Sequence, residues 1–326
     1  SFTDQTLVYG SFAHGYKAGG ANPPGAVLLQ YHNYDIAEPT HPLTFAPEFI
    51  NAFEVGTKNT MLDGALTLNT DLFYYDYKGY QISQIIDRTS VNINVDAKVK
   101  GAELEASYEP VPGLRFNFAG GWEQSRIDNG QGAIDLMDRT AGNSDWVVLK
   151  PSVTQSSNCI LPAYVVADAV AAGYGALIFA NGDNVHVPGA SAAGFADSAC
   201  GTAYNAGLDP FTGLPYTQPY PTVGSGTSLY PSHMPANYPG FNPATAPNGG
   251  AGFDKNLGGN ELPNTPPFTV SGGAQYTMPV SNDWAVTLRG DYYWQDYSWA
   301  RIFNDNPYDR LRGYTNVNLS LILTSQ

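Results

Sequence analysis

Apolar and polar residues alternate one by one through much of the chain. The pattern is clearest over 284–295, where Trp284, Val286 and Leu288 alternate with small or polar residues and with Arg289. Because successive side chains of a β-strand point to opposite faces of its sheet, such segments predict strands with one apolar and one polar face. We expect long strands at 5–18, 47–60, 65–80, 95–109, 114–127, 267–279, 284–302 and 313–324.

The connectors between these segments alternate between short and long. Tight turns are expected at 62–64, 110–113 and 281–283, and the first contains Asp63-Gly64, a strong hairpin signal. The other connectors are longer, and the one at 128–266 is by far the longest. In an antiparallel meander every second connector lies at the same end of the sheet. All the tight turns therefore fall at one end, an asymmetry typical of outer-membrane β-barrels.

The charged residues decide which face of each strand meets lipid. A slip of one residue would exchange the two faces. It would place Arg289 in the bilayer, at a cost of about 2–4 kcal/mol near the midplane. We therefore expect the apolar sets, such as Leu114, Phe116 and Phe118, to face lipid and the polar sets to line a wide, wet or plugged lumen. The register of 5–18 stays open, because its apolar residues fall on both faces.

Composition agrees with a membrane barrel rather than a soluble enzyme. Only 13% of the residues are charged, against about 25% in typical soluble domains. The net charge of −14 argues against a nucleic-acid partner, which needs clustered Lys and Arg. The apolar run 160–180 is interrupted by Pro162 and Asp168, so a short loop helix near 163–172 is a better interpretation than a membrane-spanning helix. The predicted fold class is all-β, an antiparallel up-and-down transmembrane β-barrel.

The two cysteines, Cys159 and Cys200, lie in a region rich in Gly and Pro. A pair in such a loop suits an oxidising compartment, and we predict a disulfide between them. Two unrelated free thiols are the alternative. If the pair is bridged, chain-entropy arithmetic assigns the loop closure about 4 kcal/mol.

No arrangement of residues predicts an enzyme. The five histidines are scattered, and His32, Asp35 and His41 are better explained as polar loop residues than as a metal site. We therefore predict no catalytic residues, no metal site and no cofactor.

Several stretches resemble the barrel of TonB-dependent outer-membrane receptors. PEFINAFEVGTK (47–58), followed by a hairpin and an aromatic strand end, resembles the P-E-x-x-x-x-x-E-x-G-x-K segment of that family. VKGAELEASY (99–108) resembles its G-x-E-x-E strand, and NTPPFTVSGGAQY and GYTNVNLSL resemble later strands. The resemblance covers about 1–130 and 262–326 and leaves the long connector unmatched.

The resemblance implies a 22-stranded barrel around an N-terminal plug. Residues 1–326 would then be a partial barrel domain of about eight strands, with 128–266 as a long extracellular loop. The plug, the TonB-binding box and the last strands are expected to lie outside this chain. The implied function is capture of a scarce nutrient in the outer membrane of a Gram-negative bacterium, with energy supplied by TonB. The ligand would be a ferric siderophore first, or a saccharide or cobalamin.

Aromatic and basic residues near the loop end are the candidates for ligand contact. They are predicted on the inward face and are Tyr75, Tyr77, Tyr293, Tyr297, Trp299 and Arg301. The 128–266 loop is aromatic and weakly charged, so it suits either stacking on sugar or catecholate rings or an ordered lid. Two other functions stay open. One is a passive outer-membrane porin or channel, and the other is a secreted β-rich glycan-binding protein.

Overall fold

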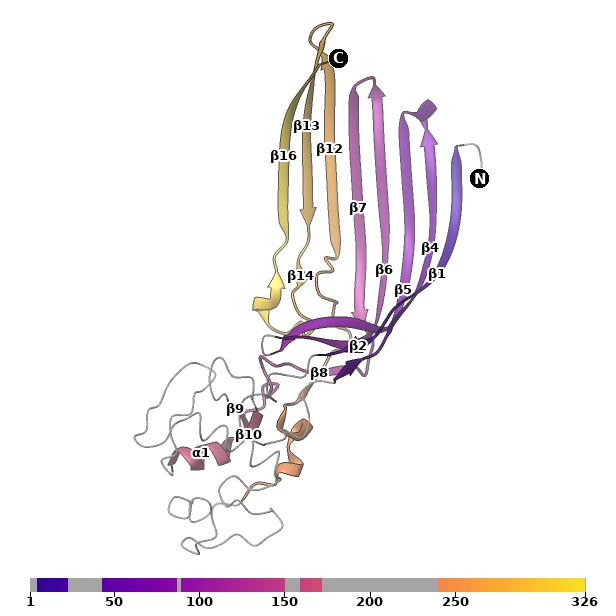
Figure 1. Ribbon diagram of the computed structural model, residues 1–326. Helices are drawn as coiled ribbons and strands as arrows, with labels where there is room; N and C mark the ends of the chain where they lie inside the picture. Colours follow the sequence, from indigo (N-terminus) through magenta and orange to yellow (C-terminus); the bar gives the residue numbers. More distant parts are fainter. Residues whose placement is uncertain (1–4, 23–42, 87–88, 150–158, 172–239, 326) are drawn as a thin grey trace, which may run out of the picture.

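The computed structural model describes residues 5–22, 43–86, 89–149, 159–171 and 240–325 (Figure 1). They form one eight-stranded antiparallel sheet in which each strand pairs with the next along the chain. Its strands are β1 (Thr6–Lys17), β4 (Glu48–Met61), β5 (Leu66–Ile86), β6 (Thr89–Val111), β7 (Leu114–Ile127), β12 (Phe268–Pro279), β13 (Trp284–Gln295) and β16 (Tyr314–Ser325). The all-β meander is confirmed, as an open sheet whose edges are β1 and β16.

The two ends of the sheet differ, as the connector lengths predicted. At the end drawn uppermost in Figure 1, tight turns join β4 to β5, β6 to β7 and β12 to β13. The first is a 3-10 turn, η2 (Leu62–Gly64), in which Asp63 (φ 54°) and Gly64 (φ 94°) have left-handed backbones. Glycine adopts such a backbone without steric cost, which explains why the turn can be this short. We call the opposite end, where longer connectors join β1 to β4, β7 to β12 and β13 to β16, the loop end.

Short elements gather at the loop end (Figure 1). They are β2 (Gly20–Ala21), β3 (Thr44–Phe45), β8 (Gly132–Ile134), β9 (Trp146–Leu149), β10 (Cys159–Pro162), α1 (Ala163–Ala171), η4 (Pro243–Thr245), η5 (Pro247–Gly250), β11 (Asp254–Asn256), β14 (Ser298–Trp299), η6 (Pro307–Asp309) and β15 (Arg310–Leu311). The helix α1 confirms the expected loop helix. Within the described residues, no helix has the length and apolar character needed to span a membrane.

Two predicted strand boundaries were wrong. The connector expected at 81–94 is a hairpin arm, because β5 runs on to Ile86 and β6 begins at Thr89. Amide side chains fasten this arm. Gln81 Nε2 donates to the carbonyl oxygens of Ala18 (2.9 Å) and Ala46 (3.1 Å). At the other error, β13 ends at Gln295 rather than at 302. There the Asp296 carboxylate accepts the N–H of Tyr297, and the chain leaves the ladder.

The paired register separates the two faces as expected. Leu114, Tyr276, Leu288 and Leu321 are aligned in one row across β7, β12, β13 and β16. The adjacent row, on the other face, consists of Arg115, Gln275, Arg289 and Ser320. An apolar row beside a polar row is the pattern of a barrel wall between lipid and water.

The structure also fixes the register of the first strand. Phe12 lies on the apolar face, with its ring 5.0 Å from that of Phe53. Tyr9 lies on the polar face, where its hydroxyl donates to Glu54 Oε1 at 2.6 Å. Tyr9 is one reason why the pattern left this register open, since its ring counts as apolar but its hydroxyl bonds on the polar face.

Candidate functional site

An aromatic ladder lies on the polar, inner face of β5 toward the loop end. Ring centroids are 4.8 Å apart for Phe73 and Tyr75, 6.5 Å for Tyr75 and Tyr77, and 5.1 Å for Tyr77 and Tyr80. Tyr80 joins the ladder because the register shifts between Tyr77 and Tyr80, where Gly79 has φ 66°. A bulge of this kind re-aims the side chains that follow it. The structure therefore brings together two of the predicted contact residues, Tyr75 and Tyr77.

The ladder packs against the parts of two connectors that lie next to the sheet, which we call the loop base. Leu257, Leu262, Ile302 and Phe303, from two connectors, are buried in one cluster with Phe73. That cluster also includes inner-face aliphatic side chains of β5, β6 and β7, and Tyr75 and Tyr77 pack against it. The two predicted tyrosines are therefore half-buried rather than open to the lumen, and the loop base covers part of the ladder.

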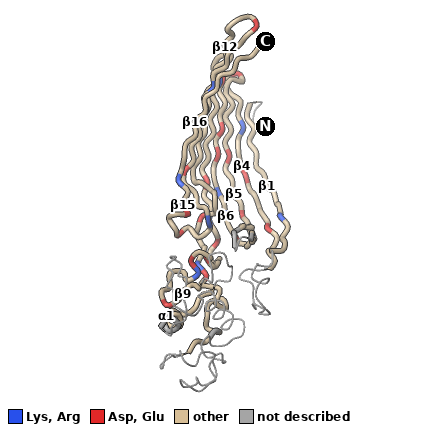
Figure 2. The backbone as a smooth tube through the Cα atoms, turned by 60° about the vertical axis from the view of Figure 1, so that its left-hand side comes forward, with Lys and Arg blue, Asp and Glu red and all other residues tan. Residues whose placement is uncertain are grey.

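Ion pairs hold this loop base together, where acidic and basic positions meet near β9 and β15 (Figure 2). Arg301 Nη1 lies 2.7 Å from Asp135 Oδ1, and Arg301 Nη2 lies 2.5 Å from Asp309 Oδ2. Lys255 Nζ lies 3.2 Å from Asp135 and 2.6 Å from Asp305. The predicted ligand cation Arg301 is thus already paired with two carboxylates.

The charges of this cluster are set by their partners. Burial alone would raise the pKa of Asp135, but hydrogen bonds from Arg301, the Met137 N–H and Lys255 hold it below its ordinary value. Burial would lower the pKa of Lys255, but its carboxylate partners raise it well above the ordinary value. Both groups are therefore charged at neutral pH, and the cluster is a fixed ionic clamp.

Beside this clamp lies an aromatic and basic group on β14 and β15. The guanidinium of Arg310 stacks on the ring of Tyr297, with 3.9 Å between the guanidinium carbon and the ring centroid. Trp299 is the cross-strand neighbour of Arg310. The Tyr297 hydroxyl donates to Glu261 Oε1 at 3.4 Å, and burial together with Glu261 raises the pKa of Tyr297. Sequence reasoning missed Arg310, because it lies after the expected strand 284–302, in the connector before 313–324, where no pattern singled it out.

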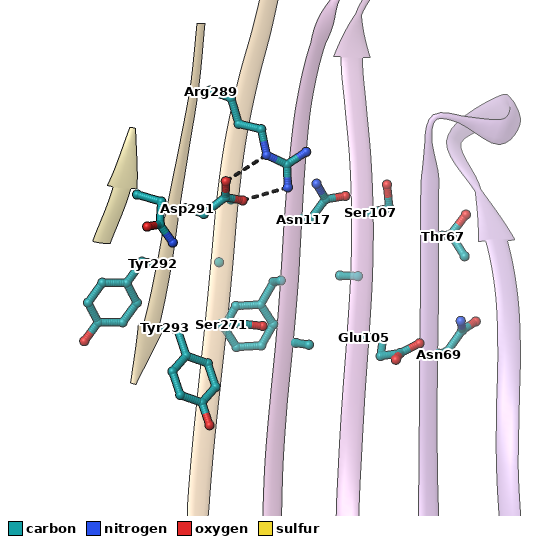
Figure 3. Close-up of a pocket in the computed structure, with 16 residues that line it drawn as sticks. Thr67, Asn69, Glu105, Ser107, Asn117, Ser271, Arg289, Asp291, Tyr292 and Tyr293 are labelled. Carbon is teal, nitrogen blue, oxygen red and sulfur yellow. Dashed lines mark hydrogen bonds and ion pairs between the residues drawn. The ribbon is translucent and has the colours of Figure 1, made fainter. Parts of the chain in front are cut away.

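Tyr293 lies elsewhere, on the inner face of β13 (Figure 3). It borders a hollow of about 480 Å³ in the inner wall. Its lining includes the hydroxyl and amide side chains of Thr67, Asn69, Ser107, Asn117 and Ser271 and the carboxylates of Glu105 and Asp291. Among the described residues that line the hollow, the guanidinium of Arg289 points at Asp291 and donates to both carboxylate oxygens at 2.8 and 2.7 Å. The hollow can therefore hydrogen-bond neutral polar groups more readily than it can bind an anion.

The six predicted contact residues thus do not share one pocket. Tyr75 and Tyr77 share the ladder, Tyr297 and Trp299 lie beside Arg310, Arg301 lies in the clamp, and Tyr293 lines the hollow. Within the described residues, no group of His, Cys, Asp and Glu is arranged to hold a metal ion.

The predicted disulfide is described at one end only. Cys159 is disulfide-bonded. Its predicted partner, Cys200, lies outside the described residues, so the pairing itself stays a prediction.

Comparison with known proteins places these features in a wider context. A family model of the TonB dependent receptor-like β-barrel matches residues 1–185. The ferric yersiniabactin uptake receptor FyuA from Yersinia pestis is 15% identical, with 98% of this chain and 28% of that one covered and a TM-score of 0.46. The ferric preacinetobactin receptor BauA from Acinetobacter baumannii is 11% identical over 99% and 28%, with a TM-score of 0.42. The siderophore receptor PiuA from Acinetobacter baumannii is 13% identical over 97% and 27%, with a TM-score of 0.42. The chain spans less than a third of each of these proteins.

Proposed function

Because the chain belongs to the TonB-dependent receptor family through its β-barrel domain, we propose that it is part of an energised outer-membrane receptor. The receptor captures a scarce nutrient at the loop end and imports it with energy supplied through TonB. The chain then works in the outer membrane of a Gram-negative bacterium, with the tight turns in the periplasm and the loop end outside the cell.

The observation that carries this proposal is the two-faced sheet. Leu114, Tyr276, Leu288 and Leu321 give one face an apolar surface fit for lipid. The other face carries hydroxyls, amides and charges fit for a wet interior. In a secreted glycan-binding protein these apolar rows would form a large patch exposed to water. Soluble proteins rarely expose apolar patches of that kind.

The loop end is the side that supports ligand capture. Its connectors form an ordered base with buried side chains, an ionic clamp and partly exposed aromatic rings. A disulfide at Cys159 suits the oxidising side of a membrane. The tight turns at the other end have too few residues to build a site.

A ferric siderophore is the first candidate ligand. The rings of Tyr75 and Tyr77 in the ladder, and of Tyr297 and Trp299 at the loop base, offer aromatic faces to planar chelating groups. A neutral saccharide is the second candidate, and a specific observation favours it. Arg289 and Arg301 are both paired with carboxylates, so these two guanidinium groups are not available to an anion.

Uptake assays in cells that carry the full-length protein test the proposal. We expect radioactive iron to enter from a ferric siderophore under iron limitation, and entry to stop when a protonophore collapses the proton-motive force. Entry that persists after the protonophore would mean a passive channel. Growth on a glycan, without any effect on iron uptake, would assign the receptor to saccharides.

A further inference from the structure

Positively charged residues are scarce in this protein, and most of those described at the loop end are already paired with carboxylates. The sequence has 15 Lys and Arg against 29 Asp and Glu. Lys255 contacts three carboxylates and Arg301 contacts two. Arg126 Nη1 is paired with Glu261 Oε1 at 3.0 Å. An anionic ligand that arrives at this end would compete with an existing carboxylate for each of these cations.

Arg310 is in a different state. Its side chain is exposed and, among the described residues, it has no carboxylate within ion-pair distance. Its guanidinium is instead stacked on the Tyr297 ring at 3.9 Å. Stacking fixes the plane of a guanidinium while leaving the N–H donors at its edge free for a bidentate bond to oxygen atoms. Within the part of the chain that the structure describes, Arg310 is therefore a pre-organised donor that no carboxylate engages.

The backbone of Arg310 is also held in place. β15 pairs with β14 through Trp299 and Arg310, and the Ala300 N–H donates to the Asp309 carbonyl at 2.8 Å. The Asp309 carboxylate, next to Arg310, accepts from Arg301 Nε at 2.8 Å. The pair between Arg301 and Asp309 thus fixes the residue that precedes Arg310.

We propose that Arg310, stacked on the ring of Tyr297 and paired across the β14–β15 ladder with Trp299, binds an anionic oxygen-rich group of the ligand, such as a catecholate or a carboxylate. Arg301 is then a positioning residue that holds Arg310 through Asp309, and it does not contact the ligand. The inference rests on the proposed function and narrows its substrate class to ligands with an anionic chelating group.

Binding assays on the full-length protein purified in detergent test this assignment. Two probes are used, a ferric tricatecholate, which is an anion, and a ferric trihydroxamate, which is neutral. Loss of a charge-assisted bidentate bond predicts that Arg310→Gln weakens tricatecholate binding at least about tenfold. Arg312→Gln is the matched control, because it removes the same charge from an exposed arginine two positions away.

The Arg301 variants separate positioning from general folding. Arg301→Gln is expected to weaken tricatecholate binding, and Arg301→Lys, which keeps one ion pair, is expected to restore most of it. The trihydroxamate affinity of Arg310→Gln and of Arg301→Lys should match that of the unmodified protein, whereas a misfolded loop base would lower both affinities.

Four results would overturn the assignment. Tricatecholate binding could be the same in Arg310→Gln as in the unmodified protein, or it could fall equally in Arg312→Gln, which would mean diffuse electrostatics. The unmodified protein could also bind only the trihydroxamate, in which case the assignment fails but the siderophore function stands. If it binds neither ferric complex, the proposed siderophore function fails and this inference fails with it.

Discussion

Asp135 and Arg301 lie 166 positions apart in the sequence and form an ion pair of 2.7 Å, in which the Asp135 side chain is only 2% exposed. The pair joins the beginning of the longest connector to the connector between β13 and β16. Lys255, near the end of the long connector, forms an ion pair with the same Asp135 carboxylate. Two loops that are separate in sequence are therefore one ionic unit at the mouth of the sheet.

Removing the central charge should loosen that unit. In Asp135→Asn, Arg301 and Lys255 lose a buried partner, and losing one member of a buried pair costs about 3–5 kcal/mol. The amide oxygen retains part of the bonding, so we expect local unfolding of the loop base to become easier by about 2 kcal/mol. Hydrogen exchange of 254–264 and 298–311 measures this change. Asp145→Asn, at an exposed site in the same connector, is the control and should change nothing.

The same unit predicts how stability depends on pH. The pKa of Asp135 is lower in the folded protein than in the unfolded chain, where it is about 3.9. The stabilisation from its charge is thus present above that value and is lost as the pH falls through the folded pKa. The raised pKa of Lys255 gives a pH dependence of the opposite sign. The stabilisation from its charge is present at lower pH and is lost only in strong alkali.

Protease sensitivity of the loop base should therefore be flat from about pH 5 to 9 and rise below about pH 4. In Asp135→Asn the acid step should become smaller. An acid step of full size in that variant would show that other carboxylates cause it.

The aromatic ladder predicts a strict requirement for glycine at position 101. A Cβ there would overlap the carbonyl oxygen of Trp122 and the ring of Phe73. We expect Gly101→Ala to reduce the free energy of unfolding by about 1–3 kcal/mol, the usual cost of overpacking. Gly10→Ala is a matched strand substitution, because its Cβ would make an ordinary contact of 3.8 Å with Glu54. Urea unfolding in lipid vesicles compares the two, and equal losses would contradict the close packing of Phe73.

Much of the fold follows from side-chain alternation alone. The segment expected at 114–127 is β7 to the residue, since it begins directly after a tight turn and alternates over 114–123. The wrong strand boundaries have local causes that the alternation of apolar and polar residues cannot reveal. Side-chain amides such as Gln81 extend the β5–β6 hairpin, and the Asp296 carboxylate ends β13.

The candidate site was less predictable for a related reason. Tyr75 and Tyr77 lie in one strand, so parity alone brings them together. Arg301 was placed on the inner wall by extending β13, but its partner Asp135 comes from a connector whose path no local pattern specifies. For the same reason Arg310 was missed, since its stack on Tyr297 depends on how β14 and β15 meet.

The central claim is that this sheet separates lipid from a wet interior. Neighbouring positions in β7 test it most directly, because Phe118 lies on the apolar face and Ala119 on the polar face beside Glu105 and Ser271. Single-cysteine substitutions Phe118→Cys and Ala119→Cys, in the full-length protein in outer membranes, are treated with a small water-soluble thiol reagent. The account predicts rapid labelling of Ala119→Cys and none of Phe118→Cys unless the reagent is lipid-soluble. Equal labelling of both variants by the water-soluble reagent would contradict it.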